Sequence, residues 1–472
     1  MTSSLLGLSI ALIYLLGIVS AIMALMSSRT SQGAVAWIIS LLTFPYVAVP
    51  AYWLFGRPRF YGYVSARGAR DSVLRQVLSR YRDNVMPHLA QPGSAEIQAV
   101  EQLAMMPLTQ GNQTTLLING EATFESLFAG LDEAQDYILL QFFIIRDDAL
   151  GRQLQGHLIK AARRGVRVYF LYDGIGSHAL GEGYLRDLEE EGVSVSAFRS
   201  SRGVKHRFQL NFRNHRKVAV VDGKKGWVGG LNVGVEYLGQ SPRHGAWRDT
   251  HLVLEGPSVL GLQEAFWEDW HWATGEVISL SWQPHASDTA DHRVVIVPSG
   301  PADEQDTASL LVQSLIHSAR ERLWVTSPYF VPDQGVQDAL RLAAMRGVDV
   351  RVMMPERPDH LLVFLSAFAF LPDMLRAGVK IYRYLPGFLH QKVILIDDSA
   401  ASVGTVNLDN RSFRLNFEIT AFIPSVEFAT EVSNMLEQDF TQCREVTLEE
   451  LRQQPLWKKV ISRAAYLTSP IQ

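Results

Sequence analysis

Two short segments of the chain place a histidine and a lysine two residues apart, ahead of an apolar run and an aspartate. HRKVAVVD contains His215, Lys217 and Asp222, and HQKVILID contains His390, Lys392 and Asp397. Imidazole can attack an electrophile or transfer a proton, and ammonium groups can hold phosphoryl oxygens. The duplicated pattern therefore indicates phosphodiester chemistry carried out by two histidines.

Each motif is followed by a glycine-rich turn with an asparagine, and then by an acidic residue ahead of an apolar strand. The asparagines are Asn232 in GGLN and Asn407 in GTVN, and the acids are Asp249 in WRDTHLVL and Glu418 in NFEITAFI. Strand alternation puts the histidine and lysine of one copy on one face. A single copy could be an ordinary strand edge. Two copies favour a shared site, because packing selects volume and not imidazole together with ammonium.

A phosphodiester transfer needs a nucleophile, a proton donor for the leaving alcohol, and positive charge around the phosphoryl oxygens. One imidazole can form a phosphohistidine while the other acts as acid and then base. The phosphate would be held by Lys217, Lys392, Asn232 and Asn407, and the histidine tautomers would be oriented by Asp249 and Glu418. Asp222 and Asp397 complete the motifs but lie a strand away from the histidines, which favours structural ion pairs for them over direct catalysis.

We predict no metal and no cofactor. The chain has one cysteine, Cys443, and no HExxH pattern or comparable ligand cluster accompanies its histidines. Exchange of one phosphodiester for another needs no nucleotide.

The elements that must position these residues also occur twice. AARRGVRV at residues 161–168 and AAMRGVDV at 343–350 each read as a helix end, a glycine cap and the start of a strand. Upstream, YILLQFFII at 137–145 corresponds to LWVTSPYFV at 323–331; downstream, EEEGVSV at 189–195 corresponds to LRAGVKI at 375–381. Alternating strand and helix patterns predict an α/β layered fold in two copies, which we place at residues 110–285 and 286–472.

The N-terminus is apolar enough to enter a membrane. Residues 5–26 and 34–55 form two uncharged stretches, each of bilayer-spanning length, which predict a transmembrane hairpin within residues 1–60 and a connector at 61–109. The first stretch lacks the basic start and cleavage site of a signal peptide, and two buried core helices would rarely be uncharged on all faces. Positive charge after the second stretch, at Arg57, Arg59, Arg67 and Arg70, outweighs Arg29 between the stretches and favours a cytoplasmic catalytic region.

The paired H-x-K-x4-D motifs resemble the signature of the phospholipase D superfamily. With GGLNVGVEYLG and WRDTH after the first motif, SPYFVPD ahead of the second, and RTSQGAVAW in the hairpin, nearly the whole chain resembles the bacterial cardiolipin synthases. The resemblance implies two fused phospholipase D-like α/β/α sandwich domains behind the hairpin, in a multi-pass protein of the bacterial inner membrane.

The resemblance also implies an activity. His215 would be the nucleophile and His390 the acid and base, although the symmetry of the halves leaves this assignment reversible. A phosphatidyl group would pass from one phosphatidylglycerol to another through a phosphohistidine, giving cardiolipin and glycerol. A phospholipase D, or a synthase that uses a donor such as phosphatidylethanolamine, remains an alternative. A decayed membrane scaffold would not retain both motifs intact.

Other features bear on the partner. LLVFLSAFAFL at 361–371 could enter the membrane interface or form a core helix, and residues 456–467 could lie on anionic lipid or form an ordinary capping helix. A basic run just before the first motif could draw anionic head groups or be a solvated face; it comprises Arg199, Arg202, Lys205, Arg207, Arg213 and Arg216. The net charge of −4 and pI near 6.4 argue against a nucleic-acid partner. The oligomeric state stays open, with a homodimer as one expectation.

Overall fold

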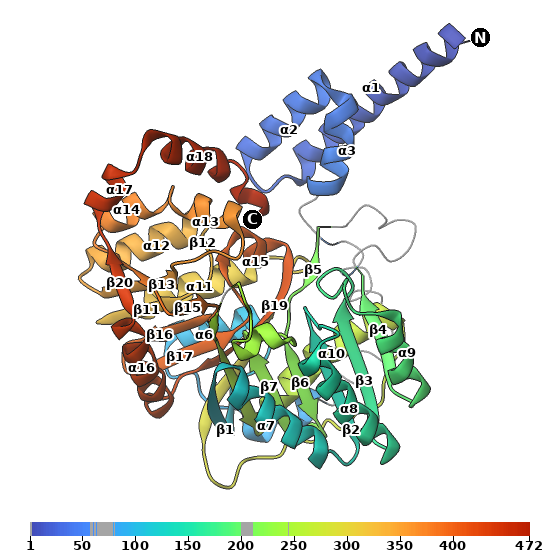
Figure 1. Cartoon of the computed structure of the whole chain (residues 1–472), viewed down its shortest axis with the longest axis vertical. Helices are drawn as coiled ribbons and strands as arrows, with labels where there is room; N and C mark the ends of the chain where they lie inside the picture. Colours follow the sequence, from blue (N-terminus) through green and yellow to red (C-terminus); the bar gives the residue numbers. More distant parts are fainter. Residues whose placement is uncertain are drawn as a thin grey trace.

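The computed structural model describes residues 2–56, 60, 63, 79, 81–199, 211–243 and 245–472. It shows a mixed α/β body from which three N-terminal helices project (Figure 1). Seven basic residues lie outside the described residues: Arg57, Arg59, Arg67, Arg70, Arg202, Lys205 and Arg207. The first four were used to predict the membrane orientation, and the other three to predict attraction of anionic lipid head groups.

One 16-stranded sheet runs through both halves of the body. The first half contributes the strand order β1-β9-β7-β6-β2-β3-β4, formed by Thr109–Ile118, Thr250–Glu255, Lys225–Gly229, Val218–Val221, Tyr137–Phe142, Arg167–Asp173 and Ser194–Phe198. The second half repeats it as β10-β19-β17-β16-β11-β13-β14, formed by His292–Ser299, Asn416–Ile423, Ala400–Gly404, Val393–Ile396, Arg322–Thr326, Asp349–Pro355 and Lys380–Tyr384. The halves meet where β1 pairs antiparallel with β10, and β20 (Cys443–Val446) extends the second half at its outer edge.

The strand registers correct one sequence correspondence. Gln141 of β2 lies opposite Val218, and Thr326 of β11 lies opposite Val393. Because Val218 and Val393 occupy the same motif position, Gln141 corresponds to Thr326 and not to Ser327. The alignment of 137–145 with 323–331 is therefore wrong by one residue, since two apolar runs look alike at neighbouring offsets and only the ladder distinguishes them.

Helices cover both faces of the first half of the sheet. On one face lie α7 (Asn119–Glu133), α8 (Ala149–Arg163) and α9 (Glu182–Glu190), and on the other lies α10 (Val259–Thr274). Alternate residues of β2 point to opposite faces of the sheet. Ile138 and Leu140 lie in the hydrophobic cluster with α7 and α8, and Leu139 lies in the cluster with α10. The predicted glycine caps end α8 and its counterpart α12 (Gln334–Met345), with φ of 89° at Gly165 and 93° at Gly347.

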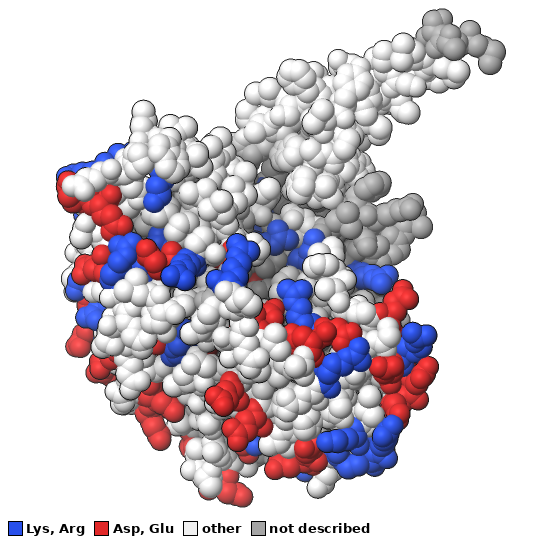
Figure 2. Space-filling model, in the orientation of Figure 1, with Lys and Arg blue, Asp and Glu red and all other residues white. Residues whose placement is uncertain are grey.

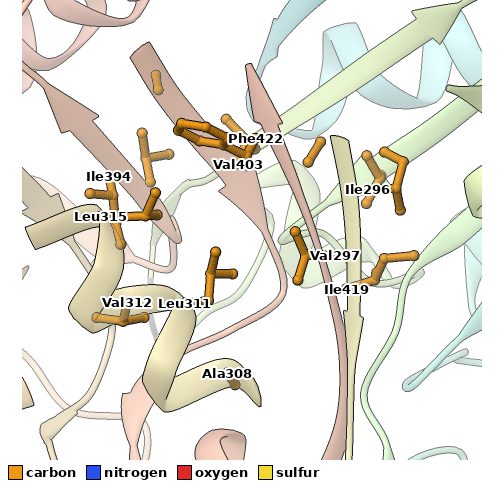
Figure 3. Packing of buried hydrophobic residues seen from close by; sticks show 14 of the residues in the cluster. Ile296, Val297, Ala308, Leu311, Val312, Leu315, Ile394, Val403, Ile419 and Phe422 are labelled. Atoms are coloured by element: carbon orange, nitrogen blue, oxygen red, sulfur yellow. The ribbon is translucent and has the colours of Figure 1, made fainter. Parts of the chain in front are cut away.

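The second half is packed in the same way. Leu311, Val312 and Leu315 of α11 (Thr307–Ser318) point into a core that also contains Ile394 of β16 and Phe422 of β19 (Figure 3). Full burial of such side chains is worth about 1.5–3 kcal/mol each. Helix α16 (Val426–Thr441) also packs against this half of the sheet, where it contacts β14, β16 and β17.

The N-terminal projection differs from the expected hairpin. Helix α1 (Thr2–Ser27) contains one stretch, Leu5–Ser27, that is long and apolar enough to cross a membrane. The second expected span is not one helix, because α2 (Ser31–Thr43) ends before Phe44 and α3 starts at Pro45 and runs to Phe55. Proline has no N–H for the preceding turn and is favoured at a helix start. On the face seen in Figure 2, the projection carries no charged side chain.

Segment 361–371, expected as one apolar unit, is also divided. Helix α13 (Leu361–Ala367) leaves Leu361 and Leu362 exposed, at 64% and 50%, and α14 (Leu371–Arg376) follows after a turn. Helix α18 (Leu456–Tyr466) packs against α13 and exposes Leu456 and Trp457. The other helices within the described residues are α6 (Ala95–Ala104), α15 (Asn410–Arg414) and α17 (Leu448–Gln453), with η1 (Met86–His88), η3 (Val235–Leu238) and η4 (Ser469–Ile471).

Asp222 and Asp397 sit at the far ends of β6 and β16 from the histidines. The Asp222 carboxylate accepts hydrogen bonds of 2.8–2.9 Å from the N–H groups of residues 135–137. Asp397 accepts equivalent bonds from the N–H groups of residues 320–322. No ion pair to either carboxylate occurs among the described residues, so the expected structural ion pairs are wrong and backbone donors take their place.

We expect Asp222→Asn to lower the free energy of unfolding by about 1–3 kcal/mol, because a charged acceptor of three backbone N–H bonds is replaced by a neutral one. Asn tolerates the positive φ of 54° at this position, so backbone strain does not contribute. The measurement is Tm in detergent, with Asp398→Asn, an exposed carboxylate in the equivalent turn of the second half, as the control. Equal Tm values for the two variants would contradict the structural role of Asp222.

Candidate active site

The two histidines are held by short strand pairings that cross between the halves. Strand β5 (Arg213–Asn214) runs parallel to β19, and the His215 N–H donates to the Phe417 carbonyl at 2.9 Å. In the same way β15 (Gly387–Leu389) runs parallel to β8 (Ala246–Arg248), and the His390 N–H donates to the Arg248 carbonyl at 2.8 Å. Each histidine therefore lies beside the residue that precedes the acidic residue of the other half.

The result is an exchange of histidine–carboxylate pairs between the halves. His215 Nδ1 lies 2.8 Å from Glu418 Oε2, and His390 Nδ1 lies 2.7 Å from Asp249 Oδ2. Both carboxylates are fully buried. A carboxylate accepts a proton-bearing Nδ1, so each imidazole is left with an unprotonated Nε2. This is the nitrogen that could attack phosphorus or take up a proton.

The buried carboxylates are fixed from their other side. Glu418 Oε1 accepts hydrogen bonds from Ser412 Oγ at 2.8 Å and Asn416 Nδ2 at 3.2 Å. Asp249 Oδ1 accepts from the Thr250 N–H at 2.8 Å. Burial alone would raise the pKa of each carboxyl, yet the facing histidine and the nearby lysines hold both pKa values below their usual range. Both groups are therefore charged at neutral pH.

The two lysines are buried beside the histidines. Lys217 Nζ donates to the His215 carbonyl at 2.8 Å, and Lys392 Nζ donates to the His390 carbonyl. Burial lowers the pKa of Lys217 to about 7, with the charge of Lys392 adding to the effect. Burial also lowers the pKa of Lys392, to about 8. Together with the exchanged histidine–carboxylate contacts, the lysines complete a buried cluster drawn from both halves.

Both imidazoles are neutral at neutral pH. Burial lowers the pKa of both His215 and His390 to about 4, and the two lysines contribute in the same direction against the pull of the carboxylates. Aromatic rings border each imidazole: Phe143 lies edge-on to His215 at 5.0 Å between ring centroids, and Trp247 lies 5.4 Å from His390. An anion bound between the lysines would favour the protonated imidazole.

The two asparagines differ in their surroundings. Asn232 Oδ1 accepts from the Ile144 N–H at 3.1 Å, and its Nδ2 donates to the Tyr237 hydroxyl at 2.9 Å. The buried Oδ1 of Asn407 has no hydrogen-bond partner among the described residues, while its backbone N–H donates to Ser412 Oγ. A phosphate donor role for Asn232 would use its remaining amide hydrogen.

Two buried aspartates that the sequence reasoning missed support the motifs. Asp269 of α10 accepts hydrogen bonds from Arg216 and Asn214, the neighbours of His215, and also from Gln141. Asp439 of α16 accepts from Gln391, between His390 and Lys392, and binds Arg248 through both oxygens. A signal was present, since each aspartate follows the acidic residue of its half at nearly the same distance along the chain, on the buried face of a helix.

Arg216 contradicts its predicted place in a basic surface run. Its guanidinium is buried, 2.9 Å from Asp269, and cannot attract a lipid head group. Of that run, Arg199 is exposed and Arg213 is partly buried. Within the part of the chain that the structure describes, no three histidine, cysteine or acidic side chains are grouped as metal ligands.

The chain matches two family models. The cardiolipin synthase, PLD-like domain matches residues 127–270 and 312–440, one match in each half, and the phospholipase D-nuclease N-terminal family matches residues 12–57.

Curated relatives match over nearly the full length. A cardiolipin synthase A of Pseudomonas putida is 47% identical over 475 residues, covering 98% of each chain, and one of Pseudomonas aeruginosa is 48% identical over 471 residues, covering 99% of this chain and 96% of the other. Among solved structures, phosphatidylserine synthase of Haemophilus influenzae superposes with a TM-score of 0.59 at 14% identity, over 80% of this chain and all of that one, a likeness of fold alone. The chain therefore belongs to the cardiolipin synthase family of phospholipase D-like phosphatidyltransferases.

Proposed function

We propose that this protein transfers the phosphatidyl group of one phosphatidylglycerol to the glycerol head group of a second, forming cardiolipin and releasing glycerol. The observation that carries the proposal is the exchanged pair of histidine–carboxylate contacts, which occupies Nδ1 of each ring and leaves Nε2 for chemistry, with a buried lysine two residues after each histidine. This arrangement supplies a nucleophile, a proton carrier and positive charge for a phosphodiester. The cardiolipin synthase names of the relatives point to the same reaction.

In the first step His215 Nε2 attacks phosphorus. The N–P bond forms, the P–O bond to glycerol breaks, and His390 gives its proton to the departing oxygen. His390 acquires that proton when the anionic phosphodiester binds, because the negative charge raises the pKa of an imidazole that burial otherwise keeps neutral. Lys217 and Lys392 hold the phosphoryl oxygens.

In the second step the hydroxyl of another phosphatidylglycerol attacks the phosphohistidine. Its oxygen bonds to phosphorus as the N–P bond breaks, and His390 takes the proton. Glu418 and Asp249 keep the Nδ1 proton of each ring in place through both steps. Water as the attacking group would give phosphatidic acid instead, so exclusion of water decides between a synthase and a phospholipase.

The lipid substrate requires access from a membrane, for which we propose a multi-pass anchor at residues 1–60 with a cytoplasmic catalytic body. Helix α1 would span the bilayer, and the two shorter helices α2 and α3 together would return across it. The exposed apolar residues of α13 and α18, beside Lys458, Lys459 and Arg463, would rest on anionic lipid. The repeated strand order supports two fused domains divided near residue 285.

The direct test is incubation of the purified protein with labelled phosphatidylglycerol as the sole lipid. We expect cardiolipin and glycerol in equal amounts from the wild type and neither product from His215→Ala or His390→Ala, because each histidine has a role that no other group of the site can take. Phosphatidic acid as the main wild-type product would identify a phospholipase. Turnover only after another phospholipid is added would assign the donor role to that lipid.

The lysine pKa values predict the alkaline side of the pH profile. We expect kcat/KM to fall as the pH rises through about 7 to 8, because Lys217 and Lys392 lose their protons there and the phosphate loses positive charge. Below about pH 4 the imidazoles become protonated and the nucleophile is lost.

Lys217→Arg provides the matched variant, since a guanidinium keeps its charge throughout this range. Its alkaline limb should move toward about pH 8, set by Lys392, even if its maximal rate is lower. An alkaline limb at the same pH in wild type and variant would contradict the assignment to Lys217.

A further inference from the structure

A tyrosine and an aspartate form a polar pair at the edge of the site in the second half only. The Tyr329 hydroxyl donates to Asp359 Oδ2 at 2.6 Å, and the Asp359 side chain is 19% exposed. The pair lines a small pocket together with His360, Val363 and Phe364. No step of the proposed phosphoryl transfer uses either residue.

The strand pairing places this pair beside the phosphate-binding residues. Tyr329 directly precedes β12 (Phe330–Val331), which runs parallel to β18 (Leu408–Asp409) with Phe330 opposite Leu408. Tyr329 is therefore level with Asn407. The Ser327 hydroxyl ties the two segments, since it accepts from the Leu408 N–H at 3.0 Å and donates to the Tyr329 carbonyl at 2.8 Å. Asp359 is also one of the carboxylates whose charge acts on buried Lys392.

The first half lacks this pair. The bridge between Ile145 and Val233 corresponds to Phe330 opposite Leu408, so Ile144 stands at the position of Tyr329. Counting forward from the paired strands β3 and β13, Ser177 stands at the position of Asp359, and its hydroxyl is occupied by the Phe143 carbonyl and the Ile145 N–H. The two motifs are symmetric, but the groups that border them are not.

A carboxylate at this position favours neutral hydrogen-bond donors over anionic groups. It repels a phosphate, so it does not serve the phosphodiester, whereas it accepts hydrogen bonds well from neutral hydroxyls. Its Oδ2 accepts from Tyr329 and its Oδ1 from the His360 N–H, and a carboxylate oxygen can accept more than one bond. A glycerol head group offers hydroxyls beyond the one that reacts.

We propose that Asp359, positioned by Tyr329, accepts a hydrogen bond from the non-reacting hydroxyl of the glycerol that attacks the phosphohistidine. The inference rests on the proposed function, because Asp359 would select the acceptor in the phosphatidyl transfer proposed above. In the step itself the reacting hydroxyl bonds to phosphorus, the N–P bond to His215 breaks, and the proton passes to His390. Asp359 gains no proton and orients the neighbouring hydroxyl.

The test separates loading of the enzyme from transfer to the acceptor. A phosphatidyl ester of 4-nitrophenol serves as donor, because nitrophenolate leaves without a proton donor and the burst of its release in the first turnover reports loading alone. Free glycerol is the acceptor, and the ratio of phosphatidylglycerol to phosphatidic acid reports how well glycerol competes with water. 1-Propanol, which has one hydroxyl, is the matched acceptor.

We expect Asp359→Asn to raise the glycerol concentration that gives half-maximal transfer by about ten-fold, the equivalent of one charge-assisted hydrogen bond. Tyr329→Phe should shift it in the same direction by a smaller factor. Nitrophenolate release and transfer to 1-propanol should stay near wild-type values in both variants. The control is Asp373→Asn, an exposed carboxylate of α14, which should change none of these quantities.

Three outcomes would overturn the inference. If Asp359→Asn leaves the glycerol concentration for half-maximal transfer unchanged, Asp359 does not accept a hydrogen bond from the acceptor. Equal losses with glycerol and 1-propanol would show that Asp359 supports the site as a whole. Wild-type protein that releases nitrophenolate but never forms phosphatidylglycerol would refute the proposed transfer itself, and that result is distinguishable from the other two because it needs no variant.

Discussion

The site depends on one interaction made twice, a buried carboxylate from one half of the chain holding the Nδ1 of the histidine from the other half. Glu418 with His215 and Asp249 with His390 follow from parallel pairing of the strands that lead into them. Neither half can orient its own histidine by these contacts. A duplicated sequence is thereby converted into a single site, and the antiparallel contact of β1 with β10 sets the two halves in the relation that permits the exchange.

Concentrating charge in this way has a cost that the surrounding structure must offset. Two ammonium groups and two carboxylates lie buried together, and an unpaired buried charge would be costly by several kcal/mol per ion. Asp269 and Asp439 extend the pairing outward to Arg216 and Arg248, so each histidine segment is clamped by a helix of the body. The same burial lowers the pKa of the lysines toward neutrality, which makes the site's positive charge responsive to pH.

The sequence was sufficient to predict the repeated elements of the fold and insufficient to predict the contacts that cross between the halves. The α/β repeat and its glycine caps at Gly165 and Gly347 could be predicted because each is a local pattern. The exchange of carboxylates between halves could not, since Glu418 lies some 200 residues from His215 along the chain and only the folded sheet brings them together. The prediction of one continuous second span followed hydropathy and took no account of Pro45, at which a new helix begins. Arg216 was misassigned to the surface because its partner Asp269 lies on a distant helix.

The exchange of carboxylates is tested most directly by comparing Glu418→Gln with Asp249→Asn, using the nitrophenyl donor that loads the enzyme without a proton donor. If Glu418 orients the nucleophile His215, Glu418→Gln should slow nitrophenolate release by about 10²–10⁴-fold, as loss of a tautomer-holding carboxylate does elsewhere. Asp249→Asn should leave the first-turnover burst of that release nearly unchanged and slow the subsequent transfer to glycerol, which needs His390 as a base. A large loss of release in Asp249→Asn with little loss in Glu418→Gln would contradict the assignment of His215, oriented by Glu418, as the nucleophile.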